Sequence, residues 1–280
     1  MDACRQEVDG EESEMVKKES VAELVSRLVQ GTTYEMLDAA EAIGRTGEKG
    51  VRAVAPILKS GDRESRWRAA VALERIGGPA VETLVTAARD EDFLVRVPAI
   101  WALEQIGDTR AVEPLIAELN DKDIKVRKAA VEALGKIGDI RAIQPLLGCA
   151  HPPLSERMIE ERQLCEAAQN ILDQMCRNDV KPLVAALKDN NWSVSSMATK
   201  MLDKQGCETL SGEDRAWYLA AKQDWAQCAA LGCIAIEPLR TALVLRKEEG
   251  AATALAEIQD PRSVEILLAG LMEHYDWFYV

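Results

Sequence analysis

The sequence has 280 residues, with 34 Lys and Arg against 47 Asp and Glu, and carries a formal net charge of −13. Hydrophobic residues make up 48% of the chain but aromatic residues only 4%. This balance favours closely packed helices rich in Ala and Leu over a wide β-sandwich or barrel. The acidity disfavours nonspecific binding to nucleic acid or to an anionic membrane, because both attract cationic surfaces.

The cysteines and the apolar stretches indicate where the protein resides. Seven cysteines, an odd number, include no Cys-x-x-Cys pair, which is typical of reduced thiols in a cytoplasmic protein. The N-terminal residues lack the apolar core of a secretory signal. The longest apolar stretch, residues 228–236, is shorter than the ~18–20 residues that a membrane span needs. We therefore expect a soluble cytoplasmic protein.

The first segment of the chain, residues 1–19, is acidic, and we expect it to be a frayed extension. A regular repeat follows over residues 21–147, in which residues 80–110 and 111–141 align without a gap. Glycines recur in the same frame at spacings of 30, 30 and 31 residues, at Gly47, Gly77, Gly107 and Gly138.

Each repeat of about 31 residues predicts a helix–turn–helix unit. In the clearest example, residues 112–119 form a short first helix with Pro114 in its first turn, where a missing N–H is harmless. Asp123 stands where the N-cap of a second helix belongs, and Gly138 follows its last apolar residue as a C-terminal cap. One such hairpin cannot cover its own apolar face, so the repeats must stack into a solenoid.

The pattern loosens after the regular repeats. Residues 148–235 predict irregular repeats with a longer loop and one degenerate helix pair, and residues 236–280 predict C-terminal repeats with a terminal cap. The sequence therefore predicts an all-α protein in which residues 20–280 form a single α-solenoid.

The motif at residues 80–141, roughly A-V-x-P-L-x-x-A-L followed by V-R-x-x-A-x-x-A-L-x-x-I-G, resembles the HEAT repeats of the short branch named after phycobilisome lyases. The resemblance implies an Asp–Arg ladder that runs from repeat to repeat. Its members here are spaced four residues apart on one helical face, and because the pair recurs in every unit we interpret it as structural. The ladder residues are Asp62, Arg66, Asp92, Arg96, Asp123 and Arg127.

Enzymes of this family offer alternative functions. Deoxyhypusine hydroxylase binds iron through His-Glu pairs, but His151 precedes a proline and His274 precedes a tyrosine, so that activity is disfavoured. An alkylpurine DNA glycosylase would need a basic groove, which the net charge opposes although Asp224 and Trp225 stand together. An accessory enzyme of the bilin-lyase type, or a cofactor-handling protein, stays open as the alternative. We find no catalytic motif and expect no cofactor, no metal and no enzymatic activity.

The resemblance also implies that the second helix of each repeat lines the concave surface. The third repeat then exposes Phe93, Leu94, Val97, Pro98 and Trp101, with Pro98 expected in the first turn of its helix. Aromatic and basic residues are common at these positions and often anchor protein interfaces. The predicted partner-binding residues are Tyr34, Arg63, Trp67, Arg68, Phe93, Val97, Trp101, Ile124, Lys128 and Trp192.

These positions predict a noncatalytic scaffold that binds a protein or peptide. Arg63, Arg68, Lys125 and Lys128 would form a cationic stripe beside the aromatic anchors, which favours a partner with acidic and apolar side chains. The alternative for Trp67 and Trp101 is that both side chains turn inward and fill gaps between repeats.

Overall fold

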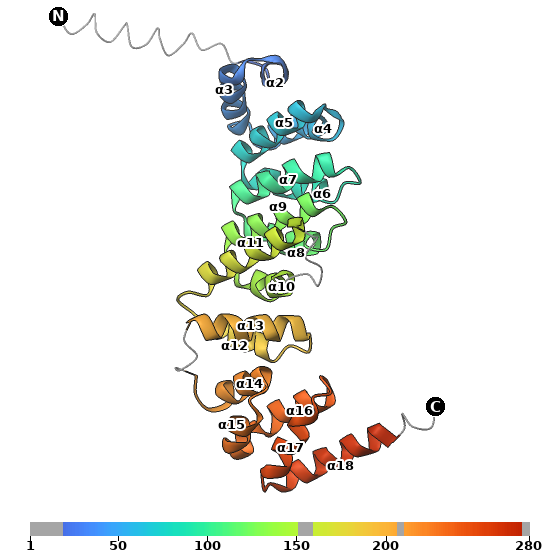
Figure 1. Ribbon diagram of the computed structural model, residues 1–280. Helices are drawn as coiled ribbons and strands as arrows, with labels where there is room; N and C mark the ends of the chain where they lie inside the picture. The colour runs from blue at the N-terminus through green and yellow to red at the C-terminus, as the bar shows by residue number, and fades with distance from the viewer. Residues whose placement is uncertain (1–18, 151–158, 206–209, 276–280) are drawn as a thin grey trace, which may run out of the picture. The chain divides into compact units, whose positions relative to one another are not determined.

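The computed structural model describes residues 19–150, 159–205 and 210–275, and every regular element in these ranges is helical (Figure 1). Most of the predicted N-terminal extension, residues 1–18, lies outside the described residues, as does His151. The chain divides into two compact units, Met1–Ile137 and Gly138–Val280, called unit 1 and unit 2 below. One continuous solenoid over residues 20–280 stays a prediction.

Within residues 19–137, unit 1 is a stack of four helix pairs joined by short loops (Figure 1). One-turn 3₁₀ helices at Gly78–Ala80 and Thr109–Ala111 lead into the third and fourth pairs. The helices are α2 (Val21–Gln30), α3 (Thr33–Gly44), α4 (Glu48–Ser60), α5 (Arg63–Ile76), α6 (Val81–Ala87), α7 (Phe93–Ile106), α8 (Val112–Glu118) and α9 (Ile124–Ile137).

The second helices of the repeats begin and end as the sequence predicts. The Asp62 side chain accepts a hydrogen bond of 2.8 Å from the Ser65 amide at the start of α5, and Asp92 accepts one of 2.9 Å from Leu94 at the start of α7. Gly107 ends α7 with φ +70°, a backbone conformation that residues with a Cβ rarely adopt. The predicted N- and C-terminal caps of these helices are confirmed.

Pro98 departs from the prediction. Because α7 begins at Phe93, Pro98 is its sixth residue and lies in the second turn, not the first. The helix nevertheless continues to Ile106 with the proline buried. Since Pro98 has no N–H, the Leu94 carbonyl lacks the amide donor that a helix normally supplies four residues later.

The core of unit 1 consists of small and branched apolar side chains from successive helices. Leu73, Leu103 and Leu134 occupy equivalent positions in α5, α7 and α9 and are completely buried. The same helices also contribute buried alanines such as Ala99 and Ala130. Helix α5 packs against α7, and α7 packs against α9. Alanine lets these helices approach closely, which explains how the chain fills its core with so few aromatic rings.

Unit 2 is also built from helix pairs, some of them short, with 3₁₀ turns at Ile140–Ala142 and Gly232–Ala235 (Figure 1). Its helices are α10 (Ile143–Cys149), α11 (Ile159–Met175), α12 (Lys181–Leu187), α13 (Trp192–Gln205), α14 (Gly212–Lys222), α15 (Trp225–Ala230), α16 (Ile236–Val244), α17 (Glu249–Glu257) and α18 (Pro261–Tyr275). The fold class is therefore all-α, and the stacked hairpins make it an α-solenoid.

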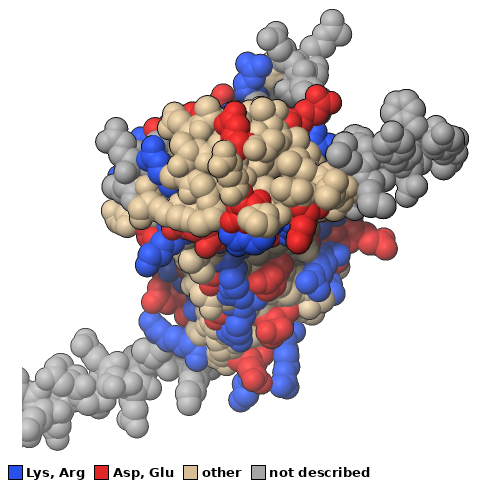
Figure 2. Space-filling model, turned by 90° about the horizontal axis from the view of Figure 1, so that it is seen from below, with Lys and Arg blue, Asp and Glu red and all other residues tan. Residues whose placement is uncertain are grey.

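The C-terminal end of unit 2 has a largely uncharged surface, which faces the viewer in Figure 2. Exposed apolar residues of this part of the chain include Ile234 before α16 and both Val264 and Leu268 on α18. None of the described helices combines the length and the apolar composition that crossing a bilayer requires.

Candidate functional site

A hollow in unit 1 brings together residues from three successive second helices. It has a volume of about 170 Å³, and it lies at the N-terminal halves of α5, α7 and α9. We call it the α7 hollow, because α7 supplies most of its wall. Its lining residues are Arg63 and Trp67 from α5, Phe93, Leu94, Val97 and Pro98 from α7, and Lys125 from α9.

The wall of the α7 hollow is mainly apolar. Leu94 is exposed, Trp67, Phe93 and Val97 are half-buried, and Pro98 is buried. The Trp67 ring meets the Trp101 ring edge to face, with centroids 5.7 Å apart and planes at 69°. Such aromatic pairs add about 0.5–1.5 kcal/mol beyond the area that they bury. Trp101 is not part of the lining. Its contact with the Trp67 ring helps to fix the orientation of that ring, which is part of the lining.

The rim of the α7 hollow is cationic. Arg63 and Lys125 are both exposed, and the lining contains no carboxylate. Lys125 Nζ lies 5.7 Å from the centroid of the Phe93 ring, within the range of a cation–π contact. Among the described residues, neither cation has an ion-pair partner within 4.0 Å. In a chain with a net charge of −13, this is a local excess of positive charge.

The carboxylates at the starts of the three helices are engaged in capping. Asp62 accepts from Ser65, Asp92 accepts from Leu94, and Asp123 accepts a hydrogen bond of 2.8 Å from the Lys125 amide. The hydrogen bond from the Leu94 amide, followed by that from the Arg66 side chain, lowers the pKa of Asp92 below its ordinary value. These aspartates accept hydrogen bonds from backbone amides that have no partner within the first turn of each helix.

The predicted Asp–Arg ladder links neighbouring repeats, with one difference. Arg66 Nη1 lies 2.6 Å from Asp92 Oδ2 in the next repeat. Arg96, buried in α7, pairs with Asp121 of the next repeat at 2.9 Å, although Asp123 is the residue equivalent to Asp92 in that repeat. The Asp123 side chain caps α9, and the guanidinium instead meets the aspartate two residues earlier. The recurring Asp-x-Asp spacing at 90–92 and 121–123 is the sequence pattern that could have indicated this.

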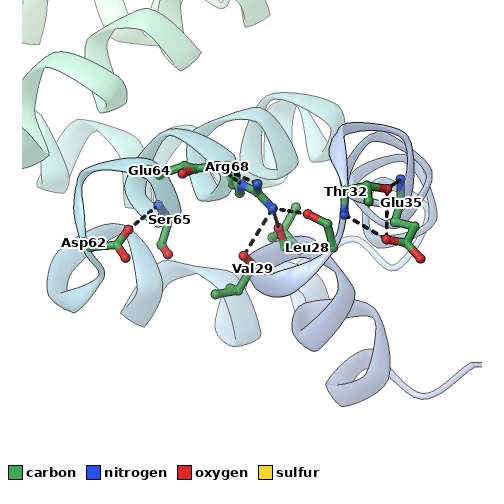
Figure 3. Close-up of polar contacts among 9 residues, drawn as sticks. Leu28, Val29, Thr32, Glu35, Asp62, Glu64, Ser65 and Arg68 are labelled. Carbon is green, nitrogen blue, oxygen red and sulfur yellow. Dashed lines mark hydrogen bonds and ion pairs between the residues drawn. The ribbon is translucent and has the colours of Figure 1, made fainter.

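Arg68 has a structural role that the sequence analysis missed. Its Nη1 atom donates to the carbonyls of Leu28, Val29 and Gly31, at 3.2, 3.2 and 2.7 Å, and its Nη2 atom pairs with Glu64 (Figure 3). These carbonyls belong to the C-terminal end of α2 and its cap, where helical donors run out. The side chain is only 17% exposed. The guanidinium therefore caps α2, and contact of Arg68 with a partner stays a prediction.

The other predicted partner-binding residues lie outside the lining of the α7 hollow. Tyr34 is 84% exposed near the start of α3. Ile124 and Lys128 belong to the first turns of α9, where Ile124 is half-buried and Lys128 exposed. Trp192 is 52% exposed at the start of α13, in unit 2. Four predicted residues, Arg63, Trp67, Phe93 and Val97, thus meet in one hollow, and the remaining positions do not join them.

Asp224 and Trp225, which were considered for enzymatic chemistry, have structural roles: one caps a helix and the other packs against a glycine. Asp224 caps α15 by accepting from the Gln227 amide at 3.2 Å. The Trp225 indole lies against Gly250 so closely that a Cβ at this position would overlap its Nε1 atom. Within the described ranges, no three His, Cys, Asp or Glu residues gather in a way that could hold a metal ion.

Stacked helix hairpins with aspartate-capped second helices define the class of this protein as an α-solenoid repeat protein. Residues 81–165 match the family model of HEAT repeats, and residues 249–271 match that of the PBS lyase HEAT-like repeat. These two segments therefore resemble HEAT repeats, the second of them the phycobilisome-lyase type.

Several solved structures are similar in fold. Human deoxyhypusine hydroxylase in complex with glycerol is 24% identical, with 80% of this chain and 90% of that chain covered and a TM-score of 0.41. The complex of CpcE and CpcF of phycocyanin lyase from Nostoc sp. PCC7120 is 22% identical, with coverages of 88% and 96% and a TM-score of 0.40. A designed armadillo repeat protein in complex with the peptide (KR)4 is 17% identical, with coverages of 89% and 100% and a TM-score of 0.27. No curated protein matches the chain.

Proposed function

We propose that this protein is a noncatalytic scaffold that binds a protein or peptide through the α7 hollow. The observation that carries the proposal is the lining itself: five apolar or aromatic residues and two cations, with no carboxylate, in an acidic chain. Exposed apolar patches bounded by polar residues commonly mark interaction sites. Repeat solenoids are well suited to this role, because successive second helices present one continuous surface.

The size of the hollow fits one side chain of a partner. A cavity of about 150 Å³ lined by apolar residues holds a benzene molecule, and the α7 hollow measures about 170 Å³. Phe93 and Trp67 offer ring faces and edges to such an anchor, and anchors of this kind contribute much of the binding energy of interfaces.

The composition of the lining supports a binding role without catalysis. Its polar side chains are Arg63, Lys125 and the Trp67 indole, so it contains neither a nucleophile paired with a base nor two carboxylates placed for acid–base chemistry. The proposal requires no cofactor.

Quantitative co-purification from the native host tests this proposal. Leu94→Asp places a carboxylate in the lining, whereas Leu245→Asp makes the same change at a leucine that is 52% exposed in unit 2. We expect the proteins that co-purify with the unchanged chain to be lost with Leu94→Asp and retained with Leu245→Asp. Circular dichroism would establish that both variants fold. Equal recovery of these proteins with a folded Leu94→Asp variant would overturn the proposal.

A further inference from the structure

We infer that the α7 hollow recognises a polypeptide segment in which one large apolar side chain is flanked on both sides by carboxylates. This inference rests on the proposed function and specifies its partner. The observations behind it are the volume of the hollow, the positions of its two cations and the engagement of the carboxylates around it.

The two cations come from helices on opposite sides of α7. Arg63 is the first residue of α5 and Lys125 the second residue of α9, and each of these helices packs against α7 (Figure 1). Leu94 and Val97, which receive the anchor, lie on α7 between them. A segment whose anchor enters the hollow therefore passes one cation on each side.

The spacing of the helices sets the spacing of the acidic residues. Packed helices lie about 8–10 Å apart, so α5 and α9 are separated by about 16–20 Å across α7. An extended peptide rises about 3.3 Å per residue. Carboxylates within about three residues of the anchor, on either side, would therefore reach Arg63 and Lys125.

The charges that line the hollow affect a bound segment more than the net charge of the chain does, because salt screens distant charges. At physiological ionic strength the screening length is about 8 Å, so carboxylates beyond the hollow contribute little to its potential. Those at the helix starts, Asp62, Asp92 and Asp123, already accept hydrogen bonds from backbone amides, and Asp92 also pairs with Arg66. An acidic segment is thus attracted to the hollow of an acidic protein, and a basic segment meets two like charges.

A peptide library selected against the full chain tests this inference. Each peptide carries one central large apolar residue, and the three flanking positions on either side are acidic, neutral or basic. The target proteins are the unchanged chain, Leu94→Asp, and the double variant Arg63→Glu/Lys125→Glu. The matched control is Lys49→Glu/Lys59→Glu, which makes the same charge change at two exposed lysines of α4 outside the lining.

We expect the unchanged chain and the α4 control to enrich acidic-flanked peptides. Leu94→Asp should enrich none of them, and Arg63→Glu/Lys125→Glu should weaken their binding by on the order of tenfold and shift enrichment toward basic flanks. Enrichment of neutral or basic flanks that is lost with Leu94→Asp would overturn the inference and leave the proposed function intact. Enrichment that is insensitive to Leu94→Asp would count against both.

Discussion

Three arginines of α5 illustrate how position on one helix decides the role of a side chain. Arg66 pairs with Asp92 in the next repeat, Arg68 reaches back to the carbonyls at the end of α2, and Arg63 stays exposed at the rim of the α7 hollow. The repeat period predicts the direction in which Arg66 points, because its equivalent recurs in each unit. The role of Arg68 was not predictable, since it depends on where another helix ends.

The cap that Arg68 places on α2 predicts a loss of stability. Arg68→Ala leaves the carbonyls of Leu28, Val29 and Gly31 without this charged donor. Hydrogen bonds to charged groups contribute about 1.5–3 kcal/mol, so we expect a decrease of that size in the free energy of unfolding. Arg52→Ala is the control, because the Arg52 side chain is 81% exposed, and its loss should cost less than about 0.5 kcal/mol. Urea denaturation that gives equal midpoints for both variants would contradict this role.

The pairing of Asp92 predicts a pH dependence. Hydrogen bonds from Leu94 and Arg66 lower the pKa of Asp92 in the folded state, so the stability that its ionised form contributes is present above the unfolded pKa of about 4 and is lost as the pH falls through the folded value. Asp92→Asn should therefore lower the Tm at pH 7, and the difference from the unchanged chain should shrink as the pH falls below about 4. Thermal denaturation across this pH range measures it; a difference that stays constant would show that the charge does not contribute.

At the level of the helices, the sequence predicted the hairpins because the same residue types recur at the helix starts, at the helix–helix contacts and at the helix ends. Aspartate begins α5, α7 and α9, Ala and Leu face the neighbouring helices, and glycine ends these three helices. The hollow itself was not predictable. Helical periodicity indicates the face on which Trp67 and Phe93 lie, but whether neighbouring side chains leave a space depends on packing across three helices. Pro98 was expected in the first turn although the Asp92 cap was predicted, because a helix that begins at Phe93 has Pro98 as its sixth residue.

The close approach of α3 to α5 predicts that a small enlargement is destabilising. A Cβ at Gly44 would lie 2.8 Å from the Arg75 carbonyl oxygen, which is backbone and cannot rotate away. Gly44→Ala should therefore lower the free energy of unfolding by about 1–3 kcal/mol. Gly148→Ala in α10 is the matched control, since its nearest neighbour is a Val194 methyl at 3.8 Å, and helix propensity should make it neutral or stabilising by up to about 1 kcal/mol. Equal effects of the two substitutions in chemical denaturation would contradict the packing argument.

For the whole molecule, the composition acquires a structural meaning. The few aromatic rings are informative because two of them, Trp67 and Phe93, line one hollow. Although the chain has a net charge of −13, the rim of this hollow is cationic. The two compact units, Met1–Ile137 and Gly138–Val280, were not predicted, because the repeat frame runs through residue 137 without a visible break.

The division into two units predicts that a destabilising substitution in one unit leaves the stability of the other nearly unchanged. Leu73 is completely buried in α5, and Leu73→Ala should destabilise unit 1 by about 2–5 kcal/mol. Because helix repeats contact mainly their neighbours, we expect faster amide hydrogen exchange in residues 19–137 than in the unchanged chain, with residues 159–205 and 210–275 nearly unaffected. A uniform increase over both units, measured by mass spectrometry, would show that the chain unfolds as one cooperative body.

The central claim, that the α7 hollow holds a polypeptide partner, is tested most directly by photo-crosslinking in the native host. A photoreactive amino acid replaces Leu94 in the hollow, or Leu245 in unit 2 as the control for an exposed leucine elsewhere. We predict a covalent adduct with another polypeptide from position 94 and not from position 245. The absence of a polypeptide adduct at position 94, or the same adducts at both positions, would contradict the claim.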